Sequence, residues 1–129
     1  MLNDVKALGA LLTRDLINTS PIVPEIDYDQ APFRDDEVGF TLRADGEGAL
    51  GIALNPAGSW GEQVEMAVSQ AQDWVIELLA HNGRSPVWPE CALHPGSHPL
   101  TVTVADGTAV WICPKTSDVI APVGSLGTG

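Results

Sequence analysis

Both cysteines of the chain and two of its three histidines occupy four positions in its last third. Cys91, His94 and His98 lie within one short stretch, and Cys113 follows downstream. Thiolate sulfur and imidazole nitrogen are the usual ligands of zinc in tetrahedral protein sites, which take four of them. The spacing therefore predicts a zinc site made of Cys91, His94, His98 and Cys113. If it forms, the fold must bring the first stretch back onto the segment that ends at Cys113.

A turn signal lies between the two parts of this cluster. Asp106-Gly107 separates two runs of alternating apolar residues, which is a strong indication of a two-residue β-hairpin loop. With that loop, Leu100 faces Cys113, and His98 lies on the same face two residues earlier. Diagonal neighbours on one face are about 7 Å apart, within reach of a shared ion. The predicted strand register of the hairpin thus supports a common site for His98 and Cys113.

The same residues allow two other interpretations. Cysteine is among the most frequently buried residues, so the cluster could be ordinary packing without a metal. Cys91 and Cys113 could also be a redox pair, or a disulfide in an oxidising compartment. The concentration of both cysteines and two histidines in one closable site favours zinc over these alternatives.

The number of protein ligands decides what such a site can do. Four ligands make it structural, because no coordination position remains for water or substrate. An enzyme would need one ligand outside the shell, and Glu90 would then be the nearest carboxylate to act as a base. The sequence contains no H-E-x-x-H, no G-x-S-x-G and no phosphate-binding glycine loop. We predict a structural zinc site, with a zinc-dependent hydrolase or a metal-free binding domain as alternatives.

Apolar periodicity predicts an α+β fold. An amphipathic helix spans residues 2–17, with Asp15 placed off its apolar stripe, and an extended acidic connector covers residues 21–36. A second, long helix opens at a capping box formed by Ser59 and Glu62 and ends at Asn82-Gly83. Hairpins are expected from residues 38–43 with 49–54 and from residues 100–104 with 109–112. We expect a small antiparallel sheet packed on the two helices.

The net charge of the chain constrains which molecules it can bind. Six basic and seventeen acidic residues give a formal net charge of −11, which repels phosphate backbones and anionic lipid surfaces. Direct binding of nucleic acid or membranes is therefore not expected. A basic protein partner is compatible with this charge, and solubility alone also explains it. The polar face of the long helix would meet such a partner through Glu62, Glu65, Asp73 and Glu77, although a hydrated surface explains these acids too. The function predicted is a protein-interaction or accessory module.

The chain reads as a single domain over residues 1–123, with a flexible tail over 124–129. It begins without a signal-peptide pattern and contains no apolar run of about 20 residues, so a cytoplasmic location is expected.

Residues 88–114 also carry a resemblance. They read W-P-E-C-A-L-H-P-G-S-H-P-L and, after a short interval, G-T-A-V-W-I-C-P. This pattern resembles a segment of small uncharacterised proteins of high-GC bacteria, in which C-x-x-H-P-x-x-H-P-L precedes a hairpin ending in W-x-C-P. It also resembles a reduced zinc ribbon, with Trp111-Ile112-Cys113-Pro114 as half of the second knuckle. The resemblance implies a zinc-binding module and no particular activity.

Overall fold

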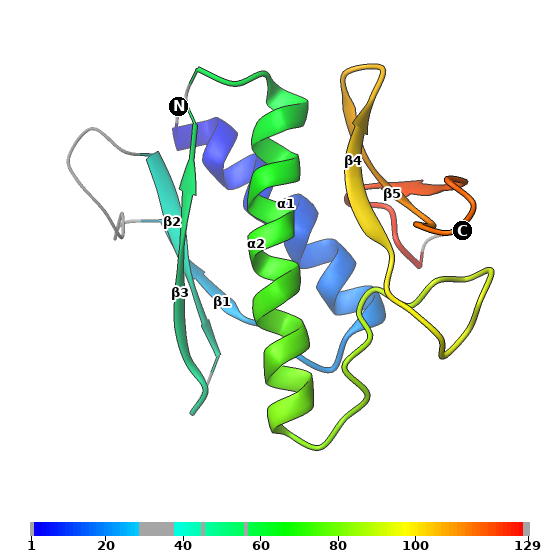
Figure 1. Cartoon of the computed structure of the whole chain (residues 1–129). Helices are drawn as coiled ribbons and strands as arrows, with labels where there is room; N and C mark the ends of the chain where they lie inside the picture. The colour runs from blue at the N-terminus through cyan, green and yellow to red at the C-terminus, as the bar shows by residue number, and fades with distance from the viewer. Residues whose placement is uncertain (1, 29–37, 45, 56, 128–129) are drawn as a thin grey trace.

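Two helices lie between two small antiparallel sheets in the computed structural model, which describes residues 2–28, 38–44, 46–55 and 57–127 (Figure 1). The predicted α+β class is confirmed, with two sheets in place of the single small sheet expected. The helices are α1 (Leu2–Thr19) and α2 (Trp60–His81). The first sheet has the strands β1 (Glu25–Asp27), β2 (Val38–Ala44) and β3 (Gly48–Leu54), and the second has β4 (Thr101–Ala105), β5 (Thr108–Ile112) and β6 (Val119–Pro122).

The long helix α2 begins where the capping box predicts. The N–H of Glu62 donates to the Ser59 hydroxyl at 3.2 Å, and that hydroxyl donates to the Glu62 carboxylate at 3.0 Å. The helix ends at Asn82, followed by Gly83 at a φ of 71°, a conformation that glycine adopts without strain. α2 contacts β3 on one side and β4 and β5 on the other, so it joins the two sheets in one core. Its predicted stripe is buried: Val64, Ala67, Val68, Ala71, Trp74, Val75 and Leu78.

The first sheet contains one strand that the sequence analysis did not predict. The hairpin of β2 and β3 is confirmed, and Phe40 pairs with Ile52 near its centre. Three residues of the expected acidic connector form β1 and pair with β2, Ile26 opposite Leu42. The rest of that connector, from residue 29 on, lies outside the described residues.

The second sheet is built on the Asp106-Gly107 turn. Both residues have positive φ, 51° and 79°, as a mirror-image two-residue turn requires. Ala105 pairs with Thr108 and Thr101 with Ile112, so the predicted register is confirmed. The strand β6 was not predicted, and it pairs with β5 at the edge of the sheet.

The prediction for Asp15 was wrong. Its side chain is completely buried and accepts hydrogen bonds from the Trp111 indole at 2.9 Å, the Gly124 N–H at 2.8 Å and the Leu126 N–H at 3.0 Å. Burial raises the pKa of this carboxyl above its ordinary value, and the three donated bonds only partly oppose the effect. Leu126 is itself buried, so residues 124–126 are held against α1, where the sequence analysis expected a flexible tail.

Within the residues that the structure describes, neither helix is long and apolar enough to cross a membrane.

Candidate metal centre

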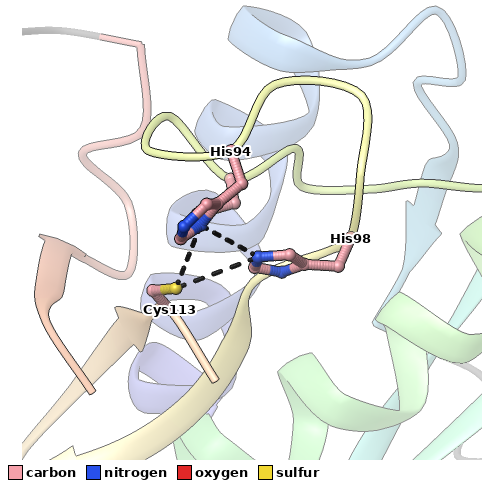
Figure 2. A group of neighbouring side chains, drawn as sticks. His94, His98 and Cys113 are labelled. Carbon is pink, nitrogen blue, oxygen red and sulfur yellow. Dashed lines mark hydrogen bonds between the residues drawn. The ribbon is translucent and has the colours of Figure 1, made fainter. Parts of the chain in front are cut away.

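The four predicted ligands come together at one end of the second sheet. One side-chain donor atom from each of Cys91, His94, His98 and Cys113 lies within 4.8 Å of the other three. Figure 2 shows both imidazole rings and the Cys113 sulfur directed toward one point. The structure therefore groups two sulfur and two nitrogen donors, a set that could hold a metal ion.

Four of the six distances between the donor atoms are close to the edge lengths of a tetrahedron around zinc. Metal bonds of about 2.3 Å to sulfur and about 2.0 Å to nitrogen place a sulfur about 3.6 Å from a nitrogen and two nitrogens about 3.3 Å apart. His94 Nδ1 lies 3.6 Å from the sulfur of Cys91 and 3.6 Å from that of Cys113. His98 Nε2 lies 3.1 Å from His94 Nδ1 and 3.9 Å from the Cys113 sulfur. These edges fit a four-coordinate site.

The loop before β4 holds three of the ligands through its backbone. The N–H of His94 donates to the Cys91 carbonyl at 3.2 Å, and the N–H of Cys91 donates to the His98 carbonyl at 3.3 Å. Gly96, with a φ of 75°, allows the bend between the two histidines. The N–H of Leu100 donates to Pro89 at 2.8 Å and closes the loop at its base. A short sequence thus brings three donors to one side.

The fourth ligand is placed by a turn after β5. The N–H of Ser117 donates to the Cys113 carbonyl at 2.8 Å, and the N–H of Cys113 donates to Asp118 at 2.9 Å. Burial by itself raises the pKa of the Cys113 thiol. Hydrogen bonds to its sulfur, chiefly from the hydroxyl and N–H of Thr116 and the N–H of Lys115, outweigh burial and lower the pKa to about 6. The thiolate that a metal requires is favoured at neutral pH.

The orientation of His98 is set by its own backbone neighbour. Its Nδ1 lies 3.0 Å from the Pro99 carbonyl, which can only accept, so Nδ1 carries the proton. Nε2 is then left with a free electron pair, and it is the atom that faces the other donors. A carbonyl that fixes the tautomer of a ligating histidine is a regular feature of metal sites.

Two buried tryptophans lie in the same hydrophobic core as the ligand cysteines. Trp88 and Trp111 meet edge to face, with ring centroids 5.7 Å apart. The Trp88 indole donates to the Thr19 hydroxyl at 2.9 Å, and that of Trp111 donates to Asp15. Both cysteines have no exposed surface, whereas both histidines are half-buried. The cluster is reached from solvent on its histidine side.

Gln72, which the sequence analysis did not single out, ties the ligand loop to α2. Its side-chain amide donates to the carbonyls of Trp88 at 3.1 Å and Leu100 at 2.6 Å, one on each side of the loop. A polar residue inside the buried stripe of α2 was the only sequence signal for this role.

We predict that Gln72→Leu lowers the free energy of unfolding by about 2 kcal/mol, because it leaves two buried carbonyls without a donor. Urea denaturation measures the change. Gln70→Leu is the matched control, since Gln70 lies in the same helix and bonds to less buried carbonyls. Equal effects of the two substitutions would contradict a role in holding the loop.

Glu90 is exposed and lies directly before the ligand Cys91. Its carboxylate accepts a hydrogen bond from the N–H of Gly96, and its backbone bridges to Pro99. The side chain therefore braces the ligand loop.

The acidic residues predicted to meet a partner lie on the outer side of α2. Glu62, Asp73 and Glu77 are exposed, and Glu65 is half-buried. The helix contains no lysine or arginine to neutralise them.

Comparisons with known proteins identify no relative. No protein-family model, curated protein or solved structure matches this chain. The assignment of the candidate site therefore depends on the sequence and geometry of this chain.

Proposed function

We propose that Cys91, His94, His98 and Cys113 hold a structural zinc ion, and that the protein acts as a zinc-stabilised interaction module. The observation that carries the proposal is the convergence of the four donor atoms, with four of their six mutual distances close to the edge lengths of a zinc tetrahedron. Two sulfur and two nitrogen donors at these distances suit zinc, whereas calcium and magnesium prefer oxygen. The resemblance of residues 88–114 to a reduced zinc ribbon agrees with this assignment.

Four protein ligands would favour a structural role over a hydrolytic one. If all four side chains bind, zinc has no position left for the water that a hydrolase would activate. The nearest carboxylate predicted for catalysis, Glu90, is engaged with the N–H of Gly96. Function then belongs to the surface that the ion helps to keep folded. The net charge of −11 and the acidic face of α2 favour a basic protein partner.

Elemental analysis of protein purified without chelator tests the metal. We expect one equivalent of zinc, and much less in Cys91→Ser, because a ligand and its negative charge are lost. His81→Ala is the matched control, since His81 is the histidine outside the cluster, and it should retain the full equivalent. Full zinc content in Cys91→Ser would contradict the ligand assignment.

Replacement of zinc by cobalt(II) tests closure. A four-coordinate site with thiolate ligands gives intense visible absorption and a sulfur-to-metal charge-transfer band. Weak absorption typical of five or six ligands would instead indicate an open site and favour the hydrolase.

A further inference from the structure

The strand β3 lies at the edge of the first sheet, in which the order of the described strands is β1-β2-β3. Its sequence, GALGIAL, contains no charged residue and no proline. An edge strand presents N–H and C=O groups to any extended chain beside it, and natural proteins usually protect such an edge with lysine, proline or a bulge. The seven residues of β3 carry none of these three protections, and α2 reaches the edge at Ala53 through Gln70, so the template for strand addition is the stretch around Ala49 and Gly51.

One hydrogen bond shows which backbone groups face outward. The side-chain amide of Gln70 on α2 donates to the Ala53 carbonyl at 3.4 Å, so this carbonyl points away from β2. In an antiparallel pair, successive residues direct their backbone groups to alternate sides. The N–H and C=O groups of Ala49 and Gly51 therefore face away from β2, on the same side as those of Ala53, and α2 reaches this side through Gln70.

The surface next to this edge carries acidic side chains around a few apolar ones. Met66, Asp73 and Glu77 lie on the same face of α2 as Gln70, and Met66 is 42% exposed. A hollow of about 670 Å³ lies between the β2–β3 turn and the last turns of α2. Its lining includes Trp74 and Leu78, together with the carboxylates of Glu47 and Glu77, although His81 also borders it. Figure 1 shows β3 and α2 running side by side.

We propose that the edge of β3 binds an extended basic segment of a partner protein as a fourth strand, with its alternate side chains directed at the acidic face of α2. This rests on the interaction role proposed above and names its surface and ligand. Backbone hydrogen bonds to Ala49, to Gly51 and to the N–H of Ala53 supply affinity, since Gln70 already bonds to the Ala53 carbonyl. Lysine or arginine at every second position supplies specificity. A second copy of the chain fits poorly, because each copy has a net charge of −11.

A synthetic peptide of about nine residues that alternates lysine with valine is the probe, because such a peptide spans the edge of β3. NMR with isotope-labelled protein should show slower amide exchange at Ala49, Gly51 and Ala53 when the peptide is added. The amides of Leu50 and Ile52 already face β2, so their exchange should stay unchanged. A peptide with glutamate in place of lysine should bind at least about tenfold more weakly.

Two substitutions separate the backbone contribution from the charge contribution. Gly51→Pro removes an outward N–H without breaking the pairing with β2, and we expect about tenfold weaker binding of the lysine peptide. Glu77→Lys should weaken it about fivefold, and less at high salt. Asp4→Lys makes the same charge change on the exposed surface of α1, and it should alter binding less than about twofold. The folding of each variant is checked by its melting temperature.

The outcomes distinguish this proposal from the metal assignment. Equal binding of both peptides, or protection that does not alternate along β3, would overturn strand addition even if the protein contains one equivalent of zinc. Slow exchange at the same amides in a dimer without peptide would assign the edge to a second copy and also overturn it. Protein without zinc that still binds the lysine peptide at β3 would overturn the metal assignment alone.

Discussion

If the four side chains hold zinc as proposed, its removal is expected to lower the melting temperature by roughly 20 °C or more. The ligand loop between α2 and β4 has little regular structure of its own, with one isolated bridge at Glu90 and Pro99. Structural zinc supplies about 10–16 kcal/mol of apparent binding energy, which equals or exceeds the stability of a typical domain. Without the ion, only the mutual contacts of the two thiols and two imidazoles would connect the ligand loop to Cys113.

The measurement compares the native protein with and without a strong chelator. The near-ultraviolet signal of the buried pair Trp88 and Trp111 reports on the second sheet, and the far-ultraviolet signal reports on both helices. Cys113→Ser should reproduce the effect of the chelator, because one thiolate is missing and three ligands hold zinc more weakly. A melting temperature that is unchanged in chelator would show that the folded protein does not depend on a metal.

Removal of the metal should destabilise some parts of the structure more than others. Asp15 on α1 binds both Trp111 and the chain near its end, so loosening of β5 should reach α1. We expect the N–H groups of Gly124 and Leu126 to lose protection together with those of the ligand loop. The first sheet packs on α2 from the other side and should retain more of its protection.

The sequence predicted the candidate site well because each step depended on local chemistry. The Asp106-Gly107 turn sets the register of β4 and β5, and the register places Cys113 beside the ligand loop. The helices followed from apolar periodicity and from the capping box of α2. The strands β1 and β6 were missed for a physical reason. Each is only three or four residues long and gains its stability by pairing with a strand already in place.

Asp15 shows a different limit of prediction from the sequence. It lies seven residues after Leu8, almost two full turns along α1, so the periodicity itself places it on the buried face. Its charge argued for the opposite face, because a buried carboxylate is costly without partners. The partners, Trp111, Gly124 and Leu126, lie about a hundred residues further along the chain. No local pattern connects them with α1.

The substitution Asp15→Ala is expected to lower the free energy of unfolding by about 3–5 kcal/mol, because it leaves three buried donors without an acceptor. Urea denaturation measures this loss, and amide exchange at Gly124 and Leu126 shows whether the end of the chain detaches from α1. Arg14→Ala is the matched control on the same helix: Arg14 is exposed, and its change should stay below about 0.5 kcal/mol. A loss below about 1 kcal/mol for Asp15→Ala would mean that water replaces the carboxylate.

The pH dependence of the unfolding free energy distinguishes an effect of the Asp15 charge from a purely steric role. Because burial raises its pKa in the folded protein, the folded state holds this proton more tightly than the unfolded state does. The stability that comes from the proton is fully present below the ordinary pKa of 3.8 and is lost as the pH rises through the raised value. Asp15→Asn cannot ionise. As the pH rises over that range, the unfolding free energy of the wild type should therefore fall relative to that of this variant. A constant difference would mean that the three donated hydrogen bonds fully offset burial.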